Sequence, residues 1–409
     1  MSDWYAGATR FDRVRDALAR NRFDLLLALT PEHAGYLAGA TNFMATHWRL
    51  PGIHACVVDA VGQKAVVSGD YGVDPAAPPP HFHVPYVGWT ESIDIRPHRD
   101  GSLAERAVAA RPERITRPPQ FNGEAIFDAV ARAVQSLAGK PSRVGVDLTE
   151  IDAVSLARLR TRLPGTDLVD ATAVLDDLRA IKDPDEIAHL RLAGELAEIG
   201  IAGALDRLEV GMSEMALNAA YQVAVHEAVI RDPRYAAFRQ AEGAVAIGIG
   251  SDSPHVVAPG QTIKFDMQVD VGGYHSDIGR TYAIDPTADQ IELYATLSAA
   301  LDELVGAVRP GITFAEIHAA ATSAMHRAGY TAFSRGHLGH SDGLTQHFEE
   351  APFIAPGEHR SVVPGMVMSV EMPYYVYGVG AFQLERMGIV TETGFELIDR
   401  LPFTFALAR

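Results

Sequence analysis

The sequence predicts a two-domain protein, with an α/β domain followed by an α+β domain. The chain has 409 residues, which is long for one ordinary domain. Its first part alternates short apolar strands with helical patterns, whereas the second part has helices and strands without strict alternation. The pattern changes near residue 175. We therefore predict domains at 1–175 and 176–409.

Apolar periodicity places the elements of the first domain. Residues 10–22 have the spacing of an amphipathic helix, and an apolar strand follows at 24–29. The segment 74–85 contains three consecutive prolines and is predicted to be a loop. Further strands are expected at 55–58, 65–68 and 143–146, and helices at 122–138 and 150–162. This order predicts a largely parallel or mixed sheet.

The second domain opens with a helix start. Asp183 is a suitable N-cap, Pro184 suits the first helical position, and Glu186 follows three residues after the cap. Beyond this first long helix, helices are expected at 213–230, 287–305 and 314–328, and strands at 262–271, 274–284 and 366–371.

Composition excludes several classes of function. The chain has 35 basic and 52 acidic residues and a formal net charge of −17, which repels nucleic acid and anionic membrane surfaces. Cys56 is the single cysteine, so no intrachain disulfide forms and a reducing compartment is expected. The N-terminus is charged where a signal peptide is apolar, and no apolar run reaches the length of about 18 residues that a spanning helix needs. We expect a cytoplasmic protein.

A predicted hairpin brings two carboxylates together. Gly272-Gly273 separates two alternating runs, and a turn there pairs residue 271 with residue 274. Asp277 then opposes Gln268, and Asp266 lies two residues further on the same face, close enough to share one site. Two converging anions repel each other unless a cation neutralises them. The alternative is a pair of solvated acids on an exposed hairpin.

Imidazole and carboxylate groups continue downstream. His337, His340 and His347 follow in one segment, and Glu371 and Glu385 come later. A histidine and carboxylates without a thiolate form a ligand set for Mn²⁺, Co²⁺, Fe²⁺ or Zn²⁺ rather than for a structural zinc of the cysteine type. Any one of these histidines alone is more often a hydrogen-bonded structural residue.

The order Asp, Asp, His, Glu, Glu, with eleven residues between the aspartates, resembles the pita-bread superfamily of methionine aminopeptidase, prolidase, aminopeptidase P and creatinase. The resemblance runs from about Leu178 to the C-terminus. The first half, including residues 30–39, looks more loosely like the N-terminal domain of creatinase and prolidase. The resemblance implies an α/β N-terminal domain and an α+β pita-bread catalytic domain.

The resemblance also implies two divalent metal ions. Asp277 and Glu385 would bridge both ions, Asp266 would chelate one, and His340 with Glu371 would bind the other. Mn²⁺ is the ion that we expect, with Co²⁺, Zn²⁺ and Fe²⁺ as alternatives.

Other residues fit the family's substrate-handling positions. His255 and His347 would hydrogen-bond the scissile carbonyl oxygen or the tetrahedral intermediate. Glu371 would move the proton of the attacking water toward the leaving nitrogen. Arg280 and Thr281 would orient the ligands, although Arg280 could equally form a surface salt bridge.

Several positions depart from the family pattern. Gln383 stands where prolidases have an arginine that is suited to a dipeptide carboxylate, and Arg386 and Phe348 stand where acids are usual. Gln268 replaces a glycine, and Asp270 is an unusual carboxylate that could perturb the metal site or pair with His275 across the strands.

We predict a metallohydrolase that cleaves an amide or peptide bond, similar to Xaa-Pro dipeptidases and aminopeptidases. One alternative is a metal-dependent lyase of the same fold that resembles dimethylsulfoniopropionate lyase. Another is a metal-free C–N hydrolase like creatinase or ectoine hydrolase, and a fourth possibility is a binding module without activity. The complete set of five ligands argues against the last two. The sequence leaves open the metal, the substrate and any requirement for proline.

The resemblance also implies a homodimer that acts on a small peptide or amide, with each N-terminal domain covering the partner's site. The segment 46–51, which follows an apparent strand end at 36–37, supplies a loop with Trp48 and Arg49. Arg49 from the neighbouring chain could replace the arginine that is missing at Gln383.

Overall fold

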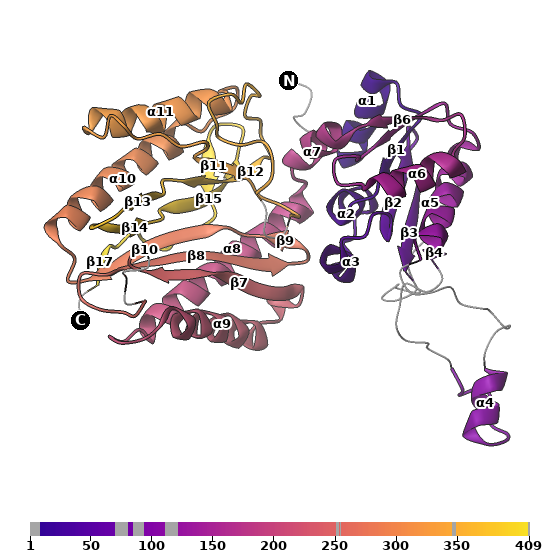
Figure 1. The fold of residues 1–409 in the computed structure, drawn as a ribbon, viewed down its shortest axis with the longest axis horizontal. Helices are drawn as coiled ribbons and strands as arrows, with labels where there is room; N and C mark the ends of the chain where they lie inside the picture. Colours follow the sequence, from indigo (N-terminus) through magenta and orange to yellow (C-terminus); the bar gives the residue numbers. More distant parts are fainter. Residues whose placement is uncertain are drawn as a thin grey trace. The chain divides into compact units, whose positions relative to one another are not determined.

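The structure is a computed structural model that describes residues 9–69, 81–84, 94–110, 122–250, 253, 255–345 and 349–407. The chain divides into an N-terminal unit, Phe11–Leu175, and a second unit from Asp176 onward, which is named the catalytic unit because it contains the five predicted metal ligands. Arg10 groups with the catalytic unit and forms ion pairs with Asp183 and Glu186. Each unit is described by itself (Figure 1).

The N-terminal unit contains a six-stranded mixed sheet with the order β4-β3-β2-β1-β5-β6. Strands β1, β5 and β6 are parallel, whereas β2 is antiparallel to both β1 and β3. Its strands are β1 (Leu25–Ala28), β2 (His54–Asp59), β3 (Lys64–Gly69), β4 (His81–Val84), β5 (Arg143–Val146) and β6 (Asp167–Asp170). The predicted mixed sheet is therefore confirmed.

Helices cover this sheet because successive strand residues point to opposite faces. Leu25 and Leu27 share one buried core with α5, which packs against β1 to β4. Helix α2 packs against β1 and β2. The helices are α1 (Arg10–Asn21), α2 (Pro31–Ala38), α3 (Phe43–Trp48), α4 (Leu103–Ala109), α5 (Gly123–Ala138), α6 (Ala153–Arg162) and α7 (Thr172–Ala180).

Two predictions for this unit need correction. Residues 36–37, interpreted as the end of a strand, lie in helix α2, because Pro31 at the first helical position starts a helix directly after β1. The predicted loop at 74–85 contains strand β4, which pairs in parallel with β3. The rest of that segment lies outside the described residues.

The catalytic unit contains two main sheets. The first has the order β17-β10-β8-β7, with β9 paired to β8. The second has the order β11-β12-β15-β16. The strands of the first sheet are β7 (Phe238–Ile247), β8 (Thr262–Val271), β9 (Tyr274–His275), β10 (Ile278–Ile284) and β17 (Ala406–Leu407). Those of the second are β11 (Gly339–Ser341), β12 (Val367–Glu371), β15 (Glu385–Val390) and β16 (Phe395–Leu397). A separate hairpin joins β13 (Tyr374–Val376) to β14 (Gly380–Phe382).

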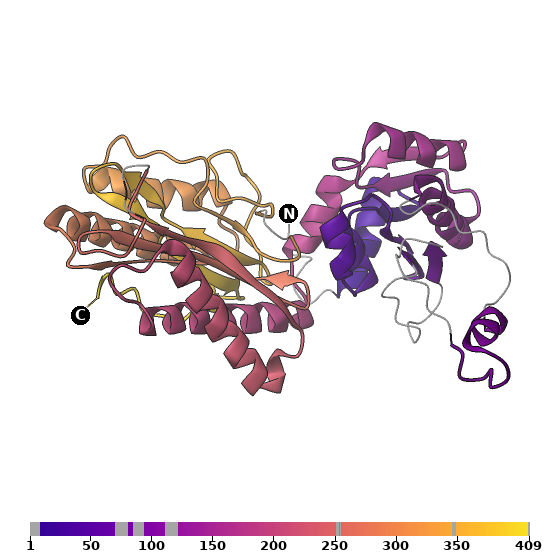
Figure 2. The same ribbon diagram turned by 60° about the horizontal axis from the view of Figure 1, so that its bottom comes forward.

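Two pairs of helices flank these sheets (Figures 1 and 2). Helix α8 packs against β8 and helix α9 against β7, while α10 packs against α11 and β12. Their bounds are α8 (Pro184–Asp206), α9 (Glu214–Arg231), α10 (Ala288–Ala307) and α11 (Phe314–Arg327), with a short 3₁₀ turn at Pro233–Tyr235. The predicted start of α8 is confirmed, because the backbone N–H of Asp183 donates to Glu186 Oε2 at 2.8 Å.

The hairpin register follows the sequence prediction. Val271 pairs with Tyr274 across Gly272 and Gly273, which have φ angles of 67° and 94° that only glycine adopts readily. The predicted strand at 274–284 is instead two strands, β9 and β10, separated by Ser276 and Asp277. The same register continues through β10, where Ile278 pairs with Met267, so Asp277 lies opposite Gln268 as predicted.

Across the parts of the chain that the structure describes, no helix has both the length and the apolar character needed to cross a bilayer.

Candidate metal centre

The five predicted metal ligands come from strands of both sheets in the catalytic unit. Asp266 lies in β8 and Asp277 directly precedes β10, while His340 lies in β11. Glu371 ends β12 and Glu385 begins β15. Five residues that are distant in sequence are therefore positioned by strands or by the residue next to one.

Three of these side chains converge closely. One ligand atom from each of Asp277, His340 and Glu385 lies within 4.8 Å of the other two. His340 Nε2 is 3.8 Å from Asp277 Oδ2 and 3.9 Å from Glu385 Oε1. All three side chains are buried. This geometry suits a cation held between an imidazole and two carboxylates.

Strand pairing brings the fourth ligand next to this group. Glu371 and Glu385 are directly opposite each other in the antiparallel pair β12–β15. Like charges in that position destabilise a sheet. The Gln383 Nε2 amide donates to Glu371 Oε2 at 2.8 Å and to Glu385 Oε2 at 3.2 Å. Gln383 thus donates to both acids and reduces the repulsion between them.

Asp266 lies at the edge of the group. Its side chain is about one-third exposed, and its Oδ2 lies 3.2 Å from Lys264 Nζ. Its charge is close enough to add to the electrostatics of the buried acids, because it raises the pKa of both Asp277 and Glu385.

The buried acids are costly to ionise in this environment. Burial raises the pKa of the Asp277 and Glu385 carboxyl groups well above their ordinary values, and neighbouring carboxylates raise it further. Burial acts to lower the pKa of His340, but the hydrogen bond with Asp342 and the surrounding carboxylate charges raise it well above its ordinary value. The site has an excess of negative charge in a low-dielectric setting.

The residues present fit divalent metal ions. Asp277 Oδ1 is buried and has no hydrogen-bond partner among the residues that the structure describes, although buried polar atoms in folded proteins are nearly always paired. A metal ion would satisfy this oxygen and neutralise the carboxylates. Oxygen and imidazole donors without thiolate are typical of Mn²⁺, Co²⁺, Fe²⁺ and Zn²⁺ sites.

Arg280 and Thr281 support the ligands from behind. Arg280 is fully buried, pairs with Asp399 and donates to the backbone carbonyl of Glu385. The alternative of a surface salt bridge at Arg280 is therefore wrong. Thr281 Oγ1 donates to the carbonyl of Gln383 at 3.0 Å and accepts from its N–H at 2.8 Å. Arg280 and Thr281 therefore connect β10 to residues 383–385, where β15 begins.

Of the other predicted residues, His255 does not belong to this group. His255 is about half exposed, and its Nδ1 lies 3.0 Å from Glu214 Oε1. His347 lies outside the described residues. Arg49 belongs to the N-terminal unit, where its guanidinium contacts Glu32 and Glu150, each at 2.6 Å.

Asp270 pairs with His275, which was one of its two predicted roles. The two residues are opposite each other in the β8–β9 pair, with Asp270 Oδ2 and His275 Nε2 at 3.8 Å. Asp270 Oδ1 also accepts the backbone N–H of Gly273 at 2.6 Å. Asp270 therefore stabilises the turn of the hairpin.

Sequence reasoning assigned no role to several residues that contact the ligands. His337 Nδ1 and an Arg335 nitrogen each lie 3.4 Å from Glu371 Oε1, and His337 Nε2 lies 3.3 Å from Glu349 Oε2. Asp342 Oδ1 lies 3.3 Å from His340 Nδ1. The period of two along β11 offered a signal for Asp342, because residues two apart in a strand share a face.

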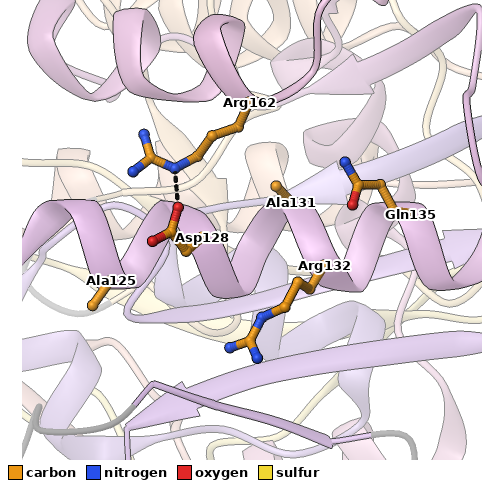
Figure 3. Close-up of a pocket in the computed structure, with 6 residues that line it drawn as sticks. All are labelled: Ala125, Asp128, Ala131, Arg132, Gln135 and Arg162. Atoms are coloured by element: carbon orange, nitrogen blue, oxygen red, sulfur yellow. Dashed lines mark hydrogen bonds and ion pairs between the residues drawn. The ribbon is translucent and has the colours of Figure 1, made fainter.

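A larger hollow lies elsewhere, on helices α5 and α6 of the N-terminal unit. Its volume is about 530 Å³, but its one acidic side chain is already paired, because Asp128 binds Arg162 (Figure 3). Its lining residues are Ala125, Asp128, Ala131, Arg132, Gln135 and Arg162. It contains none of the five predicted ligands.

Comparison with known proteins agrees with this geometry. Residues 188–392 match the model of metallopeptidase family M24, a range that contains all five predicted ligands. An Xaa-Pro dipeptidase of Lactobacillus helveticus is 26% identical over 286 residues, which cover 68% of this chain and 75% of the relative. A probable dipeptidase PepE of Mycobacterium tuberculosis is 31% identical over 245 residues, covering 57% of this chain and 62% of the relative.

Solved structures share the fold. The structure of an Xaa-Pro dipeptidase from Bacillus anthracis superposes with a TM-score of 0.73 at 20% identity, covering 97% of this chain and 99% of that one. The dipeptidase PepE from Mycobacterium ulcerans gives a TM-score of 0.68 at 26% identity, covering 97% and 96%. The predicted fold class and the predicted resemblance are confirmed. The comparisons favour a peptide hydrolase over the lyase and creatinase-like alternatives.

Proposed function

This chain belongs to metallopeptidase family M24 and is a metal-dependent peptide hydrolase, and we propose that it cleaves Xaa-Pro peptides with two divalent metal ions. The observation that carries the proposal is the buried convergence of Asp277, His340 and Glu385. Within the described part of the chain, one carboxylate oxygen of Asp277 has no hydrogen-bond partner. Such an arrangement is unfavourable unless cations occupy it.

In this proposal Asp277 and Glu385 would help to hold both ions, Asp266 would help to hold one, and His340 with Glu371 would help to hold the other. Mn²⁺ is the expected ion, with Co²⁺, Zn²⁺ and Fe²⁺ as alternatives. When bound, such ions supply Lewis-acid activation of water and of the scissile carbonyl. The donor set is compatible with all four ions, so the metal must be identified by measurement.

The chain's own residues handle the proton and the substrate. Glu371 Oε2 is held by Gln383, and its Oε1 faces Arg335 and His337. Glu371 would accept a proton from the attacking water at Oε1 and return it to the leaving nitrogen. His255 and His347 are the candidates for donating hydrogen bonds to the carbonyl oxygen, where negative charge develops.

The substrate class follows from two considerations. The relatives include proteins named Xaa-Pro dipeptidase and probable dipeptidase. Gln383 is neutral and engaged with Glu371 and Glu385, so it offers no cation to a substrate carboxylate. We therefore expect Xaa-Pro dipeptides and longer Xaa-Pro peptides both to be accepted.

The test is a substrate screen with metal-free protein reloaded with each ion. Xaa-Pro dipeptides, Xaa-Pro tripeptides and matched Xaa-Ala peptides are compared, with Glu371→Gln as the control chain of near-identical shape. We expect metal-dependent release of the N-terminal residue from Xaa-Pro substrates and loss of that activity in the control. Full activity in protein shown by elemental analysis to be metal-free would overturn the two-metal proposal, and equal rates on Xaa-Ala peptides would overturn the proline preference.

We also propose a cytoplasmic homodimer in which Arg49 of one chain contributes to the partner's site. Arg49 is about one-third exposed, and its two ion pairs fix the guanidinium in one orientation. Mixed dimers of Arg49→Ala and Glu371→Ala chains should regain part of the activity. Verified mixed dimers without recovery, or a fully active monomer, would exclude a contribution from the partner.

A further inference from the structure

The side chain of Asp342 lies behind the candidate ligand His340. Asp342 directly follows strand β11, and its backbone N–H donates to the carbonyl of Val367 at 3.0 Å, which continues the pairing with β12. Because residues two apart on a strand share a face, Asp342 and His340 point to the same side of this sheet. Ser369 is paired with His340 and so lies on that side too. The pleat of two strands therefore groups a carboxylate, an imidazole and a hydroxyl.

The contacts of Asp342 are with these two side chains. Its Oδ1 lies 3.3 Å from His340 Nδ1, and its Oδ2 lies 2.9 Å from Ser369 Oγ. The hydroxyl of Ser369 is also 3.0 Å from the backbone carbonyl of Asp277. Asp342 itself is buried, at 4% exposure. A buried carboxylate without donors would be costly, so these contacts account for its tolerance in the core.

The same contacts decide which nitrogen of His340 faces the site. Nδ1 is flanked by two acceptors, Asp342 Oδ1 and the carbonyl of Ser341 at 3.2 Å. A ring nitrogen between acceptors carries the proton. Nε2 faces Asp277 and Glu385 and is therefore the nitrogen that would bind a metal ion held with them.

We propose that Asp342 is a positioning residue that orients His340 for metal binding through Nε2 and strengthens the imidazole as a donor. This inference rests on the metal centre proposed above. A carboxylate that accepts the distal N–H of a ligand histidine fixes its tautomer and raises its basicity, and loss of such a partner typically costs about 10- to 100-fold in metal affinity or activity.

A purely structural role would look different, as Asp147 in the N-terminal unit illustrates. Asp147 also lies close to a histidine, with its Oδ2 3.1 Å from His33 Nδ1, but it accepts the backbone N–H groups of Leu29 and Thr30 at 2.7 and 2.9 Å. Those bonds tie two strand ends together. The partners of Asp342 are instead a candidate ligand and the hydroxyl of Ser369.

Lys182 is a buried cation near Asp342, but it does not replace His340 as a partner of this carboxylate. Lys182 is buried, and its Nζ donates to Ser341 Oγ at 2.9 Å and lies 3.8 Å from Glu350 Oε2. Its direct contacts are therefore with other residues. The N–H of His340 is the donor that joins Asp342 to the metal site.

The experiment measures Co²⁺ binding, with the dissociation constant from a competition titration and the coordination from the visible absorption spectrum. The chains compared are the native protein, Asp342→Ala, Asp342→Asn and the matched control Asp147→Asn. We expect about 10- to 100-fold weaker Co²⁺ binding and a changed spectrum for Asp342→Ala. Asp342→Asn keeps an acceptor for Nδ1 but loses the charge, so it should fall between the native chain and Asp342→Ala. Asp147→Asn should keep the native constant and spectrum.

The outcomes separate this inference from the proposed function. Native affinity and spectrum in both Asp342 variants would overturn the role of Asp342 while leaving the metal centre intact. If Asp342→Ala does not fold, native binding by Asp342→Asn alone would overturn it. Failure of the native chain to bind Co²⁺, or native binding by His340→Ala, would instead refute the proposed centre.

Discussion

Asp147 in the N-terminal unit and Asp277 in the catalytic unit are both buried aspartates near a histidine, but their surroundings differ. Asp147 accepts hydrogen bonds from Leu29 N–H, Thr30 N–H and the Thr30 hydroxyl, between 2.7 and 2.9 Å. Among the described residues, Asp277 accepts one hydrogen bond, from Gln268 Nε2 at 2.9 Å, and its other oxygen has no partner there. The oxygens of Asp147 thus have hydrogen-bond donors from the fold, whereas one oxygen of Asp277 is available to the proposed metal ion.

The difference separates a structural acid from a proposed metal ligand. Asp147 is surrounded by donors, which stabilise its charge and connect the ends of β1 and β5. Asp277 is surrounded by Asp266 and Glu385, whose charges raise its pKa. Buried acids with too few donors for their oxygens indicate a site that a cation completes.

The largest expected effect compares these two aspartates directly. Asp277→Ala should lose both metal ions and abolish peptide hydrolysis, a larger loss than the 10- to 100-fold typical of outer partners. Asp147→Ala should lower the unfolding temperature but keep its metal content and its kcat. Elemental analysis and kcat on an Xaa-Pro dipeptide measure both. Retention of both ions by Asp277→Ala would remove the distinction.

The next effect compares ion pairs in the two units. Arg280 and Asp399 are fully buried, whereas Arg143 and Asp167, at 2.6 Å, are about half exposed. Arg280→Ala leaves a buried charge and should cost about 3–5 kcal/mol of stability. Arg143→Ala should cost less than about 1 kcal/mol. Urea unfolding of both variants measures the difference, and similar costs would show that burial does not control these pairs.

Acid sensitivity should come from Glu350 of the catalytic unit. Although burial opposes it, the charges of Arg179 and Lys182 lower the pKa of Glu350 from 4.5 to about 2. A lowered folded pKa means that stability is fully present above pH 4.5 and is lost as the pH falls toward 2. The loss amounts to about 3 kcal/mol, at 1.36 kcal/mol for each pKa unit.

Unfolding of the native chain and Glu350→Gln at several pH values between 6 and 2 checks this prediction. Glu350→Gln should be less stable at pH 6, and the gap should narrow with acidification. A gap that does not depend on pH would contradict the assignment.

The smallest expected effect is a change in the free energy of unfolding that has opposite signs for one acid in each unit. Glu385 and Glu371 are directly opposite each other and carry like charges. In metal-free protein, Glu385→Gln removes one of the two charges and should raise the free energy of unfolding by about 0.2–1 kcal/mol. Asp147→Asn replaces one acceptor oxygen with an NH₂ group, so one of the donors around residue 147 loses its acceptor. This change should lower the free energy of unfolding by about 1–3 kcal/mol. Thermal unfolding in the presence of a chelator measures both. Adding Mn²⁺ should reverse the sign for Glu385→Gln alone.

The sequence alone determined the local elements and the hairpin. Periodicity located most helices and strands of both units, and the two glycines set the register that places Asp277 opposite Gln268. This worked because side-chain period and turn chemistry are local properties. The order of acids and histidine then led to the metal site through a resemblance, before any distance was known.

Only the tertiary structure decided which residues meet. Glu371 faces Glu385 because β12 and β15 pair, and Arg280 is buried because it reaches Asp399 and the carbonyl of Glu385. Asp342 became visible as a partner of His340 only when its burial and contacts were known. These outcomes depend on pairing between segments many residues apart, which period and spacing along one strand do not encode.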